Sequence, residues 1–241
     1  MQPRTVYVTS SWDDGHELDL KLASELAAHG MAGTFYLAPR CREIPLAKRL
    51  GPNAMRELAE RHEIGGHTLT HPRLTHVPPQ EARSEILDGK NAIEESIGRS
   101  VTSFCYPYGA YAEDHPDMVR AAGFTMARTV DRFHTGLPRD LFRMGTTTHA
   151  YRHLVDGPQV LRRARSLRQA AALWRNWDVL GRRLFEDVRQ SGGVFHLWGH
   201  SWEVEANDDW SRLRSVLDEL SDHDVVFLTN GELALELQGA G

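Results

Sequence analysis

Short apolar runs alternate along the chain with longer segments that carry an apolar face at helical spacing. The first unit is an apolar strand at 6–12, followed by Leu18, Leu22 and Leu26, which recur every fourth residue until the helix ends near Gly30. The same patterning predicts further strands at 33–37, 63–65, 101–109 (broken at Pro107), 124–128, 141–147, 194–198 and 225–228. It predicts further helices at 55–61, 79–97, 116–122, 159–174, 178–190 and 210–220, and a last helix that opens at Thr229, with Glu232 at capping-box spacing.

This alternation decides the fold class. Repeated strand-then-helix units imply parallel strands joined by helical crossovers. About seven strands in one stretch of 241 residues favour a barrel, complete or incomplete, over an open sheet. We find no linker, repeat or low-complexity run and therefore expect a single domain over 1–241. In such folds, chemistry collects at the carboxyl ends of the strands, which gives a test of position for every motif.

Composition narrows the class further. A formal net charge of −5 and a pI near 6.2 give no reason to expect a nucleic-acid partner. Two cysteines, Cys41 and Cys105, cannot build a disulfide framework. We see no apolar signal-peptide core before the first strand and no segment long enough to span a membrane, so we expect a soluble, cytoplasmic protein. The oligomeric state stays undetermined.

Two adjacent acids, Asp13 and Asp14, stand at the end of the first strand and before Gly15. Two carboxylates at this spacing repel each other unless a cation lies beside them or one takes up a proton. A simpler interpretation is a turn that also caps the next helix, because Asp favours that position.

A second motif supplies partners for a cation. His67 and His71 follow the short strand at 63–65 and are four residues apart, so on a helical turn both imidazoles would leave one face. With Asp14 they would make a three-ligand site with room for water, the arrangement of catalytic zinc, and Asp13 would be free to act as a base. Isolated pairs of this spacing are often surface histidines, and the same ligands also hold non-haem iron.

Two later motifs also lie at strand ends. The turn at Phe104–Gly109 exposes backbone N–H groups that could stabilise an oxyanion, or it is only a structural turn. Near the end of the strand at 194–198, His196 lies along the strand and His200 lies beyond Gly199. A histidine that points into the mouth could protonate a leaving amine, whereas a buried one would only satisfy a backbone partner. We prefer His200 as the acid over His196.

Taken together, these motifs resemble the polysaccharide deacetylase family, carbohydrate esterase family 4, also called the NodB-homology domain. That family is marked by T-F-D-D-G, then H-[ST]-x-x-H, then R-x-P-[YF], then a late strand that ends in a histidine. This chain reads Ser11-Trp12-Asp13-Asp14-Gly15, His67-Thr68-Leu69-Thr70-His71, Cys105-Tyr106-Pro107-Tyr108-Gly109 and His196-Leu197-Trp198-Gly199-His200 in the same order. The resemblance runs from about residue 5 to 236.

The resemblance implies a fold and a chemistry. The fold is a distorted, partly open (β/α)7 barrel of parallel strands, and the reaction is the metal-dependent removal of an acetyl group, N-acetyl before O-acetyl, from a sugar or glycan precursor. By position, Asp13 would be the catalytic base, His200 the general acid and Tyr108 the backbone oxyanion donor. Asp14, His67 and His71 would hold one divalent ion, Zn²⁺ before Co²⁺, Ni²⁺ or Fe²⁺. The residues expected to contact substrate are Trp12, Tyr106, Pro107, Trp198 and His196.

One departure from the family pattern keeps alternatives open. The arginine that orients the catalytic aspartate in the family aligns with Cys105, and a thiol cannot replace its charge. Either another group tunes Asp13, or the substrate differs. A second hypothesis is therefore a hydrolase of a small non-peptide C–N bond, such as a cyclic imide or ureide. A third is a glycan-binding relative without catalysis, against which the retained Asp13 argues.

Overall fold

The computed structural model describes residues 5–239. Its strands are β1 (Val6–Asp14), β2 (Thr34–Leu37), β3 (Glu63–Gly66), β4 (Ser103–Cys105), β5 (Met126–Arg128), β6 (Thr148–His149), β7 (Gly193–Gly199) and β8 (Val226–Phe227). Its helices are α1 (Asp19–Ala28), α2 (Pro52–Leu58), α3 (Pro79–Ile97), α4 (His115–Ala121), α5 (Gly157–Arg163), α6 (Leu167–Arg175), α7 (Trp177–Ser191), α8 (Ser201–Ala206), α9 (Trp210–Ser221) and α10 (Asn230–Gly239). Most predicted elements appear within a few residues of their expected bounds.

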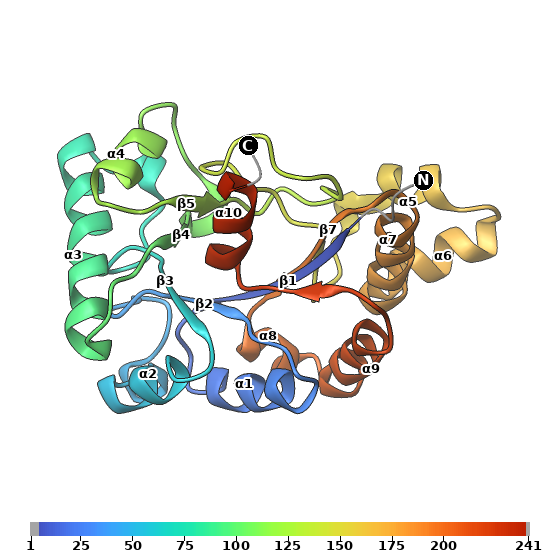
Figure 1. Ribbon diagram of the computed structural model, residues 1–241, viewed down its shortest axis with the longest axis horizontal. Helices are drawn as coiled ribbons and strands as arrows, with labels where there is room; N and C mark the ends of the chain where they lie inside the picture. Colours follow the sequence, from blue (N-terminus) through green and yellow to red (C-terminus); the bar gives the residue numbers. More distant parts are fainter. Residues whose placement is uncertain (1–4, 240–241) are drawn as a thin grey trace.

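The named strands pair in parallel and form one curled sheet in the order β5-β4-β3-β2-β1-β7-β6. Along one edge of β1, the first half pairs with β8 and the second half with β2, while β7 follows the opposite edge. The outer strands β5 and β6 do not pair with each other in the described sheet, and helices surround its outside (Figure 1). The expected distorted, partly open barrel is confirmed.

The predicted strand at 141–147 lies in this opening and is not a strand. Its backbone is irregular but makes hydrogen bonds to both sides: Ala127 N–H donates to the Leu141 carbonyl at 2.7 Å, and Thr147 N–H donates to the His196 carbonyl at 3.0 Å. The segment therefore fills the space between β5 and β7. It makes no regular ladder, so its short apolar run did not determine its conformation.

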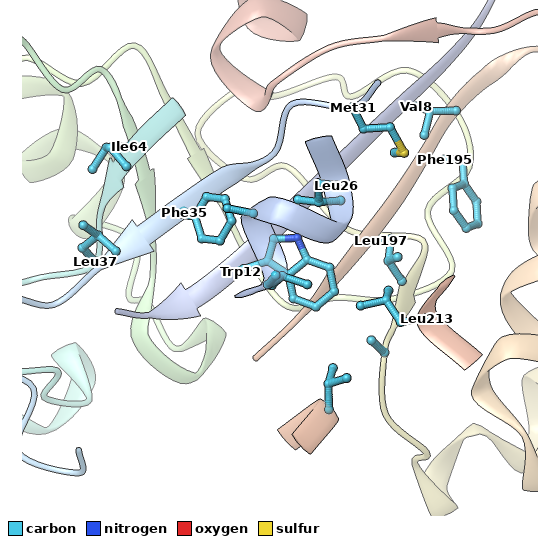
Figure 2. Close-up of a cluster of buried hydrophobic side chains, with 14 of the residues drawn as sticks. Val8, Trp12, Leu26, Met31, Phe35, Leu37, Ile64, Phe195, Leu197 and Leu213 are labelled. Atoms are coloured by element: carbon cyan, nitrogen blue, oxygen red, sulfur yellow. The ribbon is translucent and has the colours of Figure 1, made fainter. Parts of the chain in front are cut away.

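The two faces of β1 have different roles. Trp12 is fully buried on the outer face, among Leu26, Phe35 and Leu213 from the surrounding strands and helices (Figure 2). On the inner face, Thr9 and Ser11 contact the two ring nitrogens of His196 at 2.7 and 2.8 Å. Successive side chains of a strand alternate between faces, so the residue after Trp12 points into the barrel.

The long helix predicted at 159–174 is two helices. Ala164 is extended, and Ser166 begins α6 by accepting a hydrogen bond from the Gln169 N–H at 3.2 Å. Local capping by a serine hydroxyl outweighs the continuous apolar periodicity here. The capping box before α10 is confirmed, because Thr229 N–H donates to Glu232 at 2.8 Å and Glu232 N–H donates to Thr229 at 3.2 Å.

Within residues 5–239, none of the helices combines the length and the apolar character needed to cross a lipid bilayer.

Candidate active site

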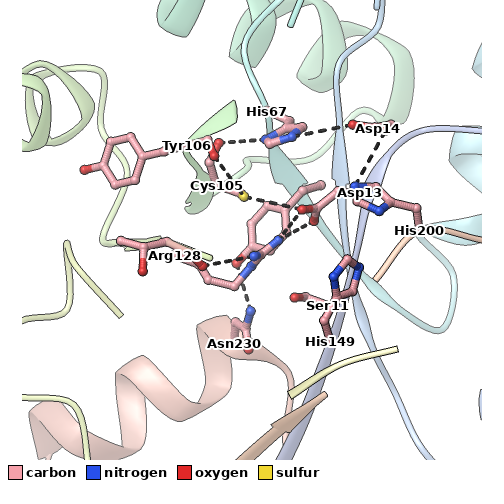
Figure 3. A network of polar contacts seen from close by, with 12 residues as sticks. Ser11, Asp13, Asp14, His67, Cys105, Tyr106, Arg128, His149, His200 and Asn230 are labelled. Atoms are coloured by element: carbon pink, nitrogen blue, oxygen red, sulfur yellow. Dashed lines mark hydrogen bonds and ion pairs between the residues drawn. The ribbon is translucent and has the colours of Figure 1, made fainter. Parts of the chain in front are cut away.

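A cleft of about 430 Å³ opens at the carboxyl ends of the central strands. β1 supplies Asp13 and Asp14, the loop after β3 supplies His67, and His200 follows β7 (Figure 3). The same loop after β3 also supplies His71. These residues are far apart in sequence. They meet because parallel strands place their carboxyl ends at one edge of the sheet.

Three potential metal ligands converge in this cleft. Asp14 Oδ1 lies 3.4 Å from His71 Nε2 and 3.7 Å from His67 Nε2, and the two imidazole nitrogens are 3.1 Å apart. Ligands held about 2.0–2.1 Å from a tetrahedral zinc ion are separated by about 3.3 Å, which is close to these distances. All three side chains are buried.

The polar surroundings leave the right atoms free for a cation. Asp14 Oδ2 accepts a hydrogen bond from the Trp202 indole at 3.1 Å, whereas its Oδ1, although buried, has no hydrogen-bond partner among the described residues. His67 Nδ1 contacts the Cys105 carbonyl at 2.7 Å, and His71 Nδ1 lies 3.1 Å from the Glu43 carboxylate. Protons on both Nδ1 atoms leave both Nε2 lone pairs facing Asp14, so the donor set fits a divalent ion.

Burial also favours the neutral form of His67. Burial, and after it the neighbouring His71, lower the pKa of this imidazole from 6.5 to about 4. A neutral imidazole is the form that binds a metal.

The expected helical turn at 67–71 is wrong. The segment is a loop in which Thr68 and His71 both have positive φ, of 64° and 65°. The buried Glu85 of α3 holds this loop by accepting hydrogen bonds from Leu69 N–H at 3.0 Å and Thr70 N–H at 2.8 Å. The imidazoles therefore converge through tertiary contacts and not through helical spacing.

His200 lies on the other side of Asp14, with Nε2 3.8 Å from Asp14 Oδ2. Its Nδ1 contacts Glu203 in the first turn of α8. Burial alone would lower the pKa of His200, but the bond to Glu203 and the negative charge of Asp14 outweigh burial and raise the pKa to about 9. His200 is thus held as a cation that faces the cleft.

Comparison with known proteins adds independent information. The family model for polysaccharide deacetylases matches residues 1–127, more than half of the chain. The chain belongs to the polysaccharide deacetylase family.

Individual relatives in this family are distant. Over 110 residues, 44% of the chain, it is 30% identical to a peptidoglycan-N-acetylglucosamine deacetylase of Bacillus cereus, of which it covers 38%. Over 148 residues, 59% of the chain, it is 29% identical to a chitooligosaccharide deacetylase of Bradyrhizobium, of which it covers 61%. The matches span less than two thirds of these relatives.

A solved structure from Mycobacterium smegmatis, assigned to the polysaccharide deacetylases, covers 99% of this chain and 92% of its own. It has a TM-score of 0.74 at 17% identity, which establishes the shared fold.

The structure identifies the cation that accompanies Asp13 in this member of the family. Arg128 of β5 contacts both carboxylate oxygens of Asp13, reaching Oδ2 at 2.5 Å, and both side chains are buried (Figure 3). β4 and β5 pair so that Cys105 is directly opposite Arg128. The family motif carries its arginine at the position of Cys105 on β4. In this chain the guanidinium reaches Asp13 from the neighbouring strand β5 instead.

This ion pair keeps Asp13 ionised. Burial alone would raise the pKa of its carboxyl, but the Arg128 charge, with smaller effects from His67 and His200, lowers the pKa from 3.8 to about 2. An unprotonated carboxylate is the form that can accept a proton.

The structure places seven of the predicted site residues around the cleft: Asp13, Asp14, His67, His71, Tyr108, Trp198 and His200. It does not place there four of the expected substrate-contacting residues: Trp12, Tyr106, Pro107 and His196, all of which are buried outside the cleft lining. Trp12 belongs to the outer core, and His196 is satisfied by Thr9 and Ser11 inside the barrel. The cleft lining therefore gives no support to the expectation that these four contact substrate, which stays a prediction.

Sequence reasoning missed several polar residues of the site, among them Glu203, Arg128 and Glu43. Glu203, three residues after His200, carried a usable signal, because that spacing lets the two side chains meet on the first turn of a helix. Arg128 and Glu43 carried none, because their positions depend on strand register and on a loop that crosses the cleft.

Proposed function

We propose that this protein hydrolyses the N-acetyl group of an amino sugar in a glycan or glycan precursor. The observation that carries the proposal is the pairing of a buried, ionised Asp13 with the neighbouring convergence of Asp14, His67 and His71. The named relatives act on N-acetylglucosamine in peptidoglycan and on chitooligosaccharides, which supports this substrate class.

The residues that would hold a divalent ion, Zn²⁺ first, are Asp14, His67 and His71. Bound there, the ion would supply a Lewis acid that polarises the acetyl carbonyl and makes water easier to deprotonate.

The chain's own groups then have distinct tasks. Asp13 accepts the proton of the attacking water, and Arg128 keeps this carboxylate ionised and fixed in orientation. The backbone N–H of Tyr108, in a turn where that residue has a φ of 58°, donates to the oxyanion as it forms. His200, protonated through Glu203, donates a proton to the departing nitrogen.

The placement of a cationic acid favours amides over esters. An amine leaves poorly unless its nitrogen is protonated, whereas an alkoxide departs more easily. The alternative substrate was considered because position 105 has a cysteine where the family has an arginine. Arg128 supplies the missing charge from β5, so that argument no longer favours a different substrate. We therefore prefer the sugar deacetylase over the hydrolase of small cyclic amides.

Aromatic side chains give the cleft surfaces for sugar rings. Trp198 lines it, and Trp202 and Tyr108 remain 38% and 41% exposed. A second hollow of about 340 Å³ adjoins it, sharing Asp14, Glu43 and Trp202. A neighbouring residue of a longer glycan could lie there, stacked against the indole.

The test is metal analysis combined with acetate release. The apoprotein is reconstituted with one equivalent of Zn²⁺ and assayed on N-acetylglucosamine oligomers, O-acetylated xylo-oligomers and a small cyclic imide. We expect turnover of the first, which Asp13→Asn lowers by about 10²–10⁴-fold without loss of bound zinc. Full activity of that variant, or unchanged zinc content in His67→Ala with His71→Ala, would contradict the proposal.

A further inference from the structure

A second group of potential metal ligands lies beside the first. Glu203 Oε2 contacts His200 Nδ1 and lies 3.0 Å from Nε2 of His149, at the end of β6. The ligand atoms of these three side chains are all within 4.8 Å of one another. One carboxylate between two imidazoles is a donor set that suits zinc.

The surroundings of His149 resemble those of a metal ligand. Its Nδ1 lies 2.7 Å from His153 Nε2, and its ring stacks on Trp198 with centroids 3.8 Å apart and planes 12° apart. The side chain is only 4% exposed. In the metal-bound form, a proton on Nδ1 would be donated to His153 and the Nε2 lone pair would be free for the ion, and such outer partners fix ligating imidazoles in orientation.

Protons and a metal ion compete for these atoms. Without metal, Glu203 can accept a hydrogen bond from each imidazole, so all three groups are satisfied. A metal must displace those protons, and we therefore expect weaker binding here than at Asp14, where Oδ1 has no competing partner among the described residues.

Occupation of this second group would disable the acid. A metal at Nδ1 of His200 would occupy the atom that now contacts Glu203, and a ring ligated there would have only its Nε2–H left, a far weaker proton donor than an imidazolium. The opposite nitrogen, Nε2, is the one that faces Asp14 and the cleft. Excess metal would leave the first site intact and remove the proton that the leaving amine needs.

We infer that His149, His200 and Glu203 form a second, weaker divalent-metal site, selective for zinc-like ions, whose occupation inhibits the enzyme. The inhibitory part rests on the proposed function, whereas the binding part does not. Metal in slight excess over one equivalent would then regulate the rate of acetyl removal.

The experiment titrates the apoprotein with ZnCl₂ and follows stoichiometry by calorimetry and acetate release on N-acetylglucosamine oligomers in parallel. A CoCl₂ titration followed by visible absorption reports each coordination step separately. Wild type should bind two equivalents, with activity that rises over the first and falls at least tenfold as the second binds.

Variants assign the two steps. His149→Gln should lose the second equivalent and its cobalt absorption, and its activity should no longer fall in excess zinc. His67→Ala should lose the tight first step and keep the weaker one. His76→Asn, which removes an exposed imidazole elsewhere, should behave as wild type.

The outcomes separate the two claims. One equivalent at every ZnCl₂ concentration up to the millimolar range, or equal inhibition of wild type and His149→Gln, overturns the second site. Two equivalents, the second lost in His149→Gln, without acetate release from any substrate would support the second binding site and overturn the proposed function, including the inhibition.

Discussion

Arg128→Met tests how this protein sets the pKa of Asp13, the proposed base. The substitution removes the guanidinium from a buried ion pair but keeps a side chain of similar length. The lowering of the Asp13 pKa from 3.8 to about 2 corresponds to about 2 kcal/mol of stability. Because the folded pKa is depressed, that contribution is present above pH 3.8 and is lost as the pH falls toward 2.

Replacing Arg128 takes away the largest of the effects that lower the pKa of Asp13. Burial, which raises the pKa of Asp13, is then opposed only by the smaller effects of His67 and His200, so we expect the pKa to rise and the fold at pH 7 to contain either an unpaired charge or a bound proton. We expect a loss of about 3–5 kcal/mol at pH 7 if the charge stays unpaired, and a smaller loss at pH 4–5. The acid limb of the pH–rate profile should move to higher pH, with kcat/KM down about tenfold to 10³-fold at pH 6.

Urea unfolding of the apoprotein at pH 4.5 and pH 7, and pH–rate profiles of the zinc-loaded enzyme, measure both effects. Arg132→Met is the matched control, since it breaks the partly buried pair with Asp156 without touching Asp13.

The decisive variant combines Cys105→Arg with Arg128→Cys. Cys105 Sγ already lies 3.7 Å from Asp13 Oδ2, so the exchanged guanidinium should restore much of the activity. An acid limb in Arg128→Met that coincides with that of wild type would refute this account of Asp13.

Three further predictions address the scaffold and the acid. Gly89→Ala would place a Cβ 2.5 Å from the Thr68 carbonyl carbon, so we expect about 1–3 kcal/mol less stability and weaker zinc binding. Urea unfolding and calorimetry measure these two effects. The control Gly181→Ala, whose Cβ would make only an ordinary 3.5 Å contact, should be neutral or stabilising. Glu203→Gln should lower the pKa of His200 from about 9, so that kcat falls at a lower pH on the basic side; an unchanged basic limb would mean that His200 is not the acid. Thr229→Ala should cost about 1 kcal/mol in urea unfolding with kcat unchanged, because it removes only the cap of α10.

Local patterning was sufficient for much of this molecule. The strand that ends in Asp13 and Asp14, the helix at 79–97 and the capping box at Thr229 each depend on residues close in sequence. Short-range periodicity and capping chemistry act over one or two turns, so the sequence shows them directly. The acidic doublet and the histidine pair also indicated one cleft, because parallel strands bring their carboxyl ends together.

Only the tertiary structure decided how that cleft is completed. The turn at His67–His71 has its shape because Glu85 of α3 binds its backbone, and Arg128 meets Asp13 because β4 and β5 pair in one register. A one-residue shift in that register would turn Arg128 to the opposite face of the sheet. Sequence alone places charges along a chain, whereas strand register and helix packing decide which of them share a buried volume, where a missing partner is most costly.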